Sequence, residues 1–203
     1  MNIEGTELEV KFFISKRKEL EMKLGISGQV SAPRVHEINL RFDTPDRSLT
    51  SAGKVLRLRQ DTRARVTYKG LGTLEGGAHL RQELEFTVSD FDTAKALFEA
   101  LGYQVYTIYE KYRTTYQLGN VEVVVDELPT GDFLEIEGPD SDSIHHAAQQ
   151  LGLNWEAGIM DSYTALFERL KVRLGLSFRD LSFDNFKDME ITPELLGVMI
   201  ADK

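Results

Sequence analysis

Charged side chains spaced two positions apart are the residues of this sequence that could do chemistry. The first such run is Glu7-Leu8-Glu9-Val10-Lys11, in strand-like sequence. Because successive side chains of a strand point to opposite faces, Glu7, Glu9 and Lys11 would converge on one face while the leucine and valine pack on the other. The same spacing recurs in Leu56-Arg57-Leu58-Arg59, Arg65-Val66-Thr67-Tyr68-Lys69, Arg81-Gln82-Glu83-Leu84-Glu85-Phe86, Lys111-Tyr112-Arg113 and Glu135-Ile136-Glu137. The repeated charged pairs indicate a binding site rather than a solvent-exposed face of a sheet.

Together, these charges predict a site for a polyanion that carries divalent cations. Arginine forks bind phosphate oxygens in bidentate geometry, lysines supply point charges, and carboxylates hold the hard ions that bridge phosphates. The segment between Arg41 and Lys69 contains eight basic residues and three acidic ones, which also indicates a local anion site. Two other interpretations stay open, namely a solvated basic sheet face and the mutual pairing of buried opposite charges.

Composition restricts the class of protein and of partner. The chain has 203 residues, of which 41% are hydrophobic and 28% charged, and no apolar run is long enough for a membrane span. It has no cysteine, so oxygen or imidazole groups would have to hold any metal. Residues 1–5 do not resemble a secretory signal, and we expect a cytoplasmic protein without membrane attachment. The net charge of −9 argues against nucleic acid bound through a broad basic surface.

The elements that must position these charges are about eight antiparallel strands. Alternation and turn residues predict strands near residues 7–11, 35–43, 55–60, 64–69, 80–88, 104–106, 109–117, 122–127 and 133–138. Helices are expected over residues 15–24, 91–101, 141–151 and 162–174, with a short one from residue 193. Apolar stripes on these helices need an apolar sheet exterior, so the charges should face inward. We therefore expect an α+β fold, an eight-stranded antiparallel β-barrel with helices packed on the outside.

In this order and spacing the motifs resemble those of the CYTH superfamily, the triphosphate tunnel metalloenzymes. Members include class IV adenylyl cyclases, thiamine triphosphatases and inorganic tripolyphosphatases. Glu7-x-Glu9-x-Lys11 is similar to the ExExK signature of that family. The resemblance covers about residues 5 to 170 and includes Arg41-Phe42-Asp43-Thr44-Pro45-Asp46, Leu56-Arg57-Leu58-Arg59, Thr67-Tyr68-Lys69-Gly70, Glu83-Leu84-Glu85, Glu110-Lys111-Tyr112-Arg113, Asp126-Glu127 and Gly131-Asp132-Phe133-Leu134-Glu135-Ile136-Glu137-Gly138. One departure is Arg41, because the family usually has tyrosine there.

The resemblance implies a charged tunnel with two sets of site residues. Mg²⁺ or Mn²⁺ would be held by Glu7, Glu9, Glu135 and Glu137, with Asp126 and Glu83 or Glu85 assisting. The triphosphate would be bound by Lys11, Arg41, Arg57, Arg59, Lys69, Lys111 and Arg113. Of these, Lys11, Arg57 and Lys69 would act in catalysis.

The activity implied by the resemblance is metal-dependent hydrolysis of a small triphosphate, such as tripolyphosphate, thiamine triphosphate or a nucleoside triphosphate. The alternative inside the family is a class IV adenylyl cyclase, which converts ATP to cyclic AMP and pyrophosphate. Alternatives of another class are a non-catalytic polyphosphate-binding module and a purely structural barrel. We expect a tunnel domain over residues 1–174 and a C-terminal extension over residues 175–203 that forms a docking tail, part of which could be disordered. A homodimer is one possible assembly.

Overall fold

The structure, a computed structural model, describes residues 5–203 of the chain. The strands are β1 (Thr6–Ile14), β2 (Gln29–Asp43), β3 (Val55–Gln60), β4 (Ala64–Lys69), β5 (Thr73–Glu75), β6 (Ala78–Val88), β7 (Gln104–Leu118), β8 (Val121–Leu128) and β9 (Gly131–Glu137). The helices are α1 (Arg17–Ser27), α2 (Ser48–Ser51), α3 (Phe91–Ala100), α4 (Ser141–Leu151), the 3₁₀ turn η1 (Trp155–Ala157), α5 (Tyr163–Leu174), α6 (Phe183–Phe186) and α7 (Pro193–Leu196). No helix in this described part is long and apolar enough to cross a lipid bilayer.

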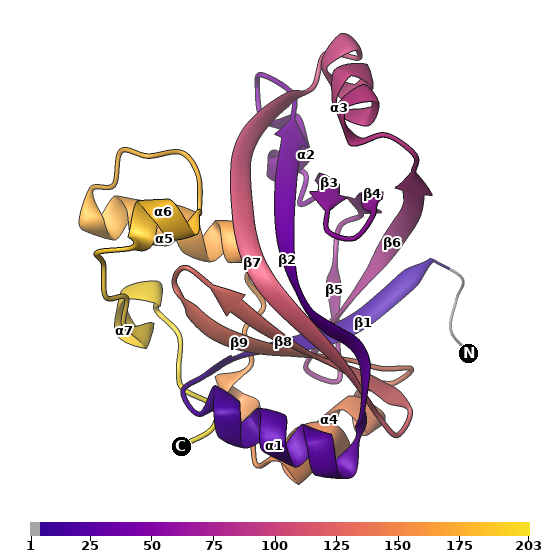
Figure 1. Cartoon of the computed structure of the whole chain (residues 1–203), viewed down its shortest axis with the longest axis vertical. Helices are drawn as coiled ribbons and strands as arrows, with labels where there is room; N and C mark the ends of the chain where they lie inside the picture. Colours follow the sequence, from indigo (N-terminus) through magenta and orange to yellow (C-terminus); the bar gives the residue numbers. More distant parts are fainter. Residues whose placement is uncertain (1–4) are drawn as a thin grey trace.

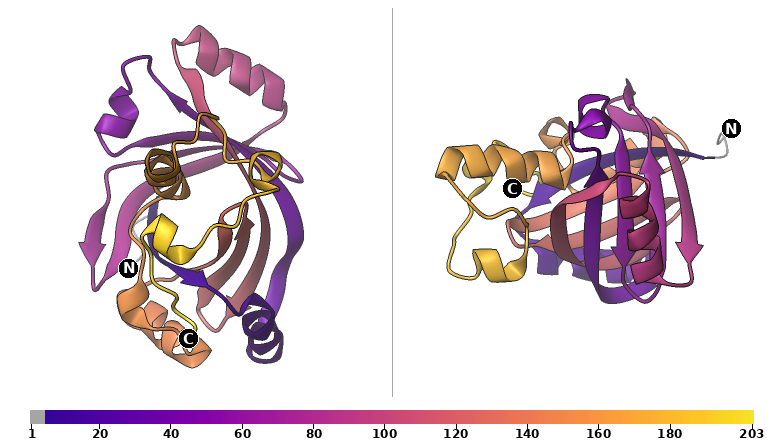
Figure 2. Two further views of the ribbon diagram at one scale, coloured as in Figure 1. Left: turned by 90° about the vertical axis from the view of Figure 1, so that its left-hand side faces the viewer. Right: turned by 90° about the horizontal axis from the view of Figure 1, so that it is seen from above.

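Eight of the strands close into a ring. Their order is β1-β9-β8-β7-β2-β3-β4-β6, and β1 also pairs with β6, so the last strand meets the first. The pairings around the ring are antiparallel, and β5 is an additional partner of β6 outside it. The ring and the helices around it can be followed in Figures 1 and 2. The predicted eight-stranded antiparallel fold with external helices is confirmed.

Apolar side chains of the strands face outward and are covered by helices. On one side α1 and α4 pack on β1, β8 and β9, where Phe12 and Ile136 lie in the same buried cluster as Leu24 and Ile144. On the other side α3 packs over β2, β3 and β4. Burial of each such side chain stabilises the fold by about 1.5–3 kcal/mol. The helices therefore bury the apolar outer face of the sheet, and the charged face lies inside the ring.

The C-terminal segment, residues 175–203, lies against one end of the ring (Figure 2). Leu181 pairs with β7, since its N–H donates to the carbonyl of Ile108 at 2.9 Å. Phe186 and Leu196 are buried in a cluster with α5. The division of the chain at residue 174 stays a prediction. In the structure this segment contacts both the ring and α5.

Several element boundaries differ from the expected ones, and three of the differences are informative. β7 is continuous where a break was expected near Thr107, and Tyr106 is the extra residue of a β-bulge, because Arg41 pairs with Thr107 and Phe42 with Val105. β2 begins at residue 29 rather than 35, because Pro33 lies in an irregular stretch where its missing N–H removes no ladder bond. α1 spans residues 17–27 instead of 15–24, and no serine side chain caps it. The Asp202 carboxylate, distant in sequence, instead accepts a hydrogen bond from the Ser15 N–H just before the helix.

Candidate functional site

The ring encloses a cavity of about 540 Å³ whose wall consists largely of charged side chains. Many of its lining residues lie two positions apart along a strand, such as Arg57 and Arg59 or Lys111 and Arg113, as alternation predicts. The basic residues that line it are Lys11, Arg41, Arg57, Arg59, Arg63, Arg65, Lys69, Arg81, Lys111 and Arg113, and the acidic ones are Glu7, Glu9, Glu37, Asp61, Glu83, Glu85, Glu122, Glu135 and Glu137. All of the predicted site residues are in this wall except Asp126, which lies buried behind it.

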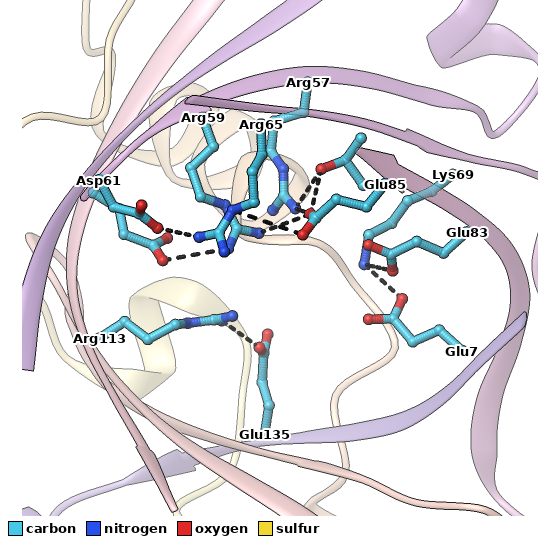
Figure 3. A network of polar contacts seen from close by, with 12 residues as sticks. Glu7, Arg57, Arg59, Asp61, Arg65, Lys69, Glu83, Glu85, Arg113 and Glu135 are labelled. Atoms are coloured by element: carbon cyan, nitrogen blue, oxygen red, sulfur yellow. Dashed lines mark hydrogen bonds and ion pairs between the residues drawn. The ribbon is translucent and has the colours of Figure 1, made fainter. Parts of the chain in front are cut away.

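Strand register places the predicted phosphate-binding arginines in adjacent rows. Arg41 of β2 pairs with Arg57 of β3, and Arg59 of β3 pairs with Arg65 of β4. Like charges directly opposite each other destabilise a sheet, so the rows need a counter-charge. The Glu85 carboxylate supplies it, at 3.5 Å from Arg57, 3.9 Å from Arg59 and 3.7 Å from Arg65 (Figure 3). The three arginines thus converge on one anionic group.

A second group of contacts joins β1, β4 and β6 (Figure 3). Lys69 Nζ lies 2.5 Å from Glu7 Oε2 and 2.8 Å from Glu83 Oε2. Arg81 bridges the carboxylates of Glu7 and Glu9, at 3.4 and 2.9 Å. Burial alone would raise the pKa of Glu83, but the charges of Lys69 and Arg57 and the hydrogen bonds of this carboxyl together lower that pKa. Three predicted metal ligands are therefore paired with cations here.

A third group is centred on Glu135 and Asp126. Glu135 lies 2.8 Å from Lys11 and 2.6 Å from Arg113. Burial would raise its pKa, but those two charges hold the pKa of Glu135 well below its usual value. The Asp126 carboxylate, fully buried, accepts hydrogen bonds from Lys111 at 2.9 Å, from Arg113 at 2.6 and 2.7 Å and from the Tyr163 hydroxyl at 2.8 Å. Both of its oxygens are thus occupied by these donors, which leaves Asp126 less suited to metal than predicted.

One row of carboxylates has fewer cation partners. Glu9 of β1 pairs with Glu137 of β9, which pairs with Glu122 of β8. Within the described residues, neither Glu137 nor Glu122 forms an ion pair. Partial burial and the neighbouring charges of Glu7, Glu122 and Glu9 raise the pKa of Glu137 to about 8, although part of its side chain is exposed. This accumulation of negative charge at adjacent register positions fits a cation.

The carboxylates predicted to hold metal are not gathered into one cluster. Among residues 5–203, no three acidic or histidine side chains lie close enough together to coordinate an ion in their present positions. The donor chemistry nevertheless fits, because the row of Glu9, Glu137 and Glu122 offers hard oxygen ligands of the kind that Mg²⁺ and Mn²⁺ prefer.

Several wall residues were missed by the sequence analysis. Glu37, almost fully buried, lies 3.4 Å from Arg59 and 3.5 Å from Lys111. Burial would raise its pKa, but the charges of Lys111, Arg113, Arg59 and Arg57 together lower the pKa of Glu37 strongly. Period-two spacing could have found Glu37, which precedes Arg41 by four positions, as well as Glu122. It did include Arg81 in a charged run, although Arg81 was not predicted as a site residue. It could not have found Tyr163 or its neighbour Thr164, because the α5 residues reach the cavity only through tertiary packing.

Tyr109 adds an uncharged polar group to the arginine side of the wall. Its hydroxyl accepts a hydrogen bond from Arg57 Nη1 at 3.3 Å. Burial would raise the pKa of this phenol, but the charges of Arg57 and Lys111 outweigh burial and lower it to about 8. A proton could therefore be held or released at this atom near neutral pH.

Known proteins that resemble this chain carry cyclase and triphosphatase descriptions. The chain is 27% identical over 138 residues to a Methanocaldococcus jannaschii protein named "Putative adenylate cyclase", covering 67% of this chain and 78% of that protein. It is 25% identical over 185 residues to "Adenylate cyclase CyaB" of Aeromonas hydrophila, covering 90% and 87%. The solved structure of the Hippeastrum protein HpAC1, described as having a dominant triphosphatase activity, matches with a TM-score of 0.61 at 14% identity and covers 95% of this chain and 100% of that one. At that identity the likeness shows a shared fold.

The family itself follows from a match over most of the sequence. The family model described as "CYTH domain" matches residues 5–162, which include all the ring strands and the charged cavity wall. The ring closure and inward-facing charges agree with the architecture expected from the resemblance. This chain belongs to the CYTH domain family.

Proposed function

We propose that this chain is a metal-dependent phosphohydrolase that cleaves a small triphosphate inside the ring. The observation that carries the proposal is the division of the cavity wall into two sides. Arginine and lysine predominate on β2, β3, β4 and β7, and carboxylates predominate on β1, β6, β8 and β9. Lys11, Arg81 and Glu37 are the exceptions to this division. A triphosphate with a bound cation has the complementary charges, because its oxygens need the basic side and its cation needs the acidic side.

Substrate phosphates would replace carboxylates as partners of the basic side chains. Lys11 pairs with Glu135 at 2.8 Å, and Arg57 lies 3.5 Å from Glu85, so phosphate oxygens could take equivalent positions. Such preorganised charges in a cavity shielded from water stabilise the negative charge that develops on the leaving phosphate. We assign this role to Lys11, Arg57 and Lys69, with Arg59, Lys111 and Arg113 holding the remaining phosphate oxygens.

The acidic side would hold the metal ion. Glu9 and Glu137 are its central ligands in this proposal, and Glu122 lies next in the row. Glu7 and Glu135 could also bind the metal ion once phosphate oxygens have replaced them as the ion-pair partners of Lys69 and Lys11. When bound, Mg²⁺ or Mn²⁺ would neutralise phosphate charge and orient the substrate. The contacts of Asp126 favour a different role for that residue, which is to position Lys111 and Arg113.

A class IV adenylyl cyclase is the second candidate, and the names of the two sequence relatives favour it. In that reaction the ribose 3′ hydroxyl attacks the α phosphorus of ATP and pyrophosphate leaves. The same cavity would serve both reactions. The fold also accommodates the first candidate, since HpAC1 shares it and is described with a dominant triphosphatase activity. A non-catalytic polyphosphate-binding module is the third candidate.

Product identification tests the proposal. With tripolyphosphate and Mg²⁺ or Mn²⁺, we expect release of orthophosphate, with turnover at least as good as on ATP and with little or no cyclic AMP from ATP. Excess chelator should abolish this turnover, and added metal should restore it. Equimolar cyclic AMP and pyrophosphate from ATP would assign the cyclase instead. Binding of tripolyphosphate without any product would assign the binding module.

A further inference from the structure

Arg41 is unlike the other buried basic residues of the cavity wall. Its side chain is 7% exposed, and within residues 5–203 its guanidinium forms no ion pair. Nη1 donates a hydrogen bond to Thr164 Oγ1 at 2.9 Å. The buried Nε has no acceptor within the described residues, as is also true of the Nε of Arg57 and Arg59. Its register partner on β3 is another cation, Arg57. The other buried lysines and arginines of the wall lie within 4 Å of at least one carboxylate.

The first turn of α5 meets Arg41 at the same end of the cavity. Ser162, Tyr163 and Thr164 line the cavity, and the hydroxyls of Ser162 and Thr164 share a hydrogen bond at 3.1 Å. The Ser162 hydroxyl caps this helix start by accepting a hydrogen bond from the Ala165 N–H at 3.2 Å. The partial positive charge of a helix start favours an anion. The end of the cavity at α5 thus combines a helix start with a buried, uncompensated guanidinium.

A buried charge without a counter-charge is unfavourable, so this arrangement implies that something absent from the free chain supplies one. The guanidinium is held in place by a neutral hydroxyl, which fixes its position without neutralising it. Burial and the nearby charges of Arg57 and Arg81 lower the pKa of Arg41, which agrees with a surplus of positive charge at this point.

The two ends of the cavity differ. At the α5 end the C-terminal segment lies over the ring (Figure 2). Elsewhere the cavity is lined by Asp61, Thr62 and Arg63 of the β3–β4 turn, and the last two of these are exposed. A bulky organic group on the substrate could therefore extend into solvent at this turn. At the other end of the cavity, α5 and the C-terminal segment would obstruct it.

We propose that Arg41 and the first turn of α5 form a subsite for a terminal, unesterified phosphate. The inference rests on the proposed function and adds a direction to it: the free phosphate end lies at α5, and the organic group or the other end of the chain points to the β3–β4 turn. The subsite selects triphosphates that have at least one free end. It excludes those that are esterified at both ends.

Binding measurements in excess chelator test this subsite without turnover. The probes are tripolyphosphate, which has two free ends, and diadenosine triphosphate, which has none. The variants are Arg41→Gln, the charge-preserving Arg41→Lys, and Lys18→Gln as a control that removes one positive charge elsewhere. Lys18 of α1 is exposed, lies outside the cavity wall and forms no ion pair among residues 5–203. All titrations are made at one ionic strength, and the Tm of each free protein is recorded.

Arg41→Gln is expected to weaken tripolyphosphate binding by about tenfold or more, as loss of a charge-assisted contact would. Arg41→Lys should stay within about fivefold of the parent and Lys18→Gln within about threefold, because an exposed charge is screened. Diadenosine triphosphate should bind the parent weakly and be insensitive to Arg41→Gln. The Tm of Arg41→Gln should not fall, because no carboxylate is left unpaired.

Unchanged tripolyphosphate affinity in Arg41→Gln, or an equal loss for both ligands, would overturn the subsite. A large fall in Tm with affinity retained would show that Arg41 only supports α5. These outcomes are separate from those that concern the proposed function. A parent protein that binds tripolyphosphate but never cleaves it would end the hydrolase proposal while the Arg41 comparison still stands, and one that binds no polyphosphate would overturn both.

Discussion

At the scale of single residues, the cations of the wall differ in what their removal leaves behind. Lys111 is 1% exposed and lies between Glu37 and Asp126, which are equally buried. We expect Lys111→Ala to lower the free energy of unfolding by about 3–5 kcal/mol, because two buried carboxylates lose a partner.

Arg57→Ala should lower the free energy of unfolding less, because Glu85 is partly exposed and keeps Arg65 as a partner. The same variant should weaken tripolyphosphate binding by about 1.5–3 kcal/mol. Denaturant unfolding and calorimetry check both, and equal stability losses in the two variants would contradict this distinction.

Glu137 gives a pH dependence whose sign can be worked out. Its pKa is raised to about 8 in the folded chain, against about 4.3 for an unperturbed glutamate. The folded state therefore binds the proton more tightly, and stability from this group is present at low pH and is lost as pH rises from about 4.3 to 8. In chelator, Glu137→Gln should gain Tm relative to the parent as pH rises from 5 to 8. The effect is reduced by the partial exposure of the side chain. A Tm difference that does not change with pH would show that the carboxylates do not repel each other.

At the scale of elements, the alternation of charged and apolar residues predicted the ring because it is a local property of each strand. It places Glu7, Arg57 and Lys69 on the inner face without any knowledge of register. It could not predict which charges meet, because Glu85 reaches three arginines only through the order of β3, β4 and β6. It also could not place Thr164 beside Arg41, since 123 positions separate them. The bulge at Tyr106 was mistaken for a break because both interrupt the alternation.

The start of α1 shows the same dependence on distant sequence, and it gives a prediction. The Asp202 carboxylate accepts hydrogen bonds from the N–H groups of Ser15 at 2.8 Å and Lys16 at 2.6 Å, so it anchors the two residues that precede the helix. Asp202→Ala should cost about 1 kcal/mol of stability, because two backbone N–H groups lose their acceptor. Asp188→Ala, an exposed acid of the same segment, is the control and should change Tm little. Equal Tm values for both variants would mean that α1 does not need this contact.

At the scale of the whole molecule, the tail and the ring share one core. Leu181, Phe186 and Leu196 are buried against α5 and its surroundings. Burial of such side chains contributes about 1.5–3 kcal/mol each, which together is a large part of the 5–15 kcal/mol typical of a domain. A chain that ends at Gly175 is therefore expected to have a much lower Tm and poor solubility, as measured by thermal melting and sedimentation. A truncated protein with the parent's Tm and activity would show that residues 176–203 are a separable arm.

The measurement that tests the central claim most directly is a crystal structure of the chain with Mn²⁺ and a triphosphate analogue that cannot be hydrolysed. Anomalous scattering locates the metal, and the phosphates are located by their electron density. We predict manganese at the row of Glu9, Glu137 and Glu122, phosphates on Arg57, Arg59 and Lys69 in place of their carboxylate partners, and the free end at Arg41. Triphosphate and metal bound outside the ring, with the ion pairs of the wall unchanged, would contradict the account.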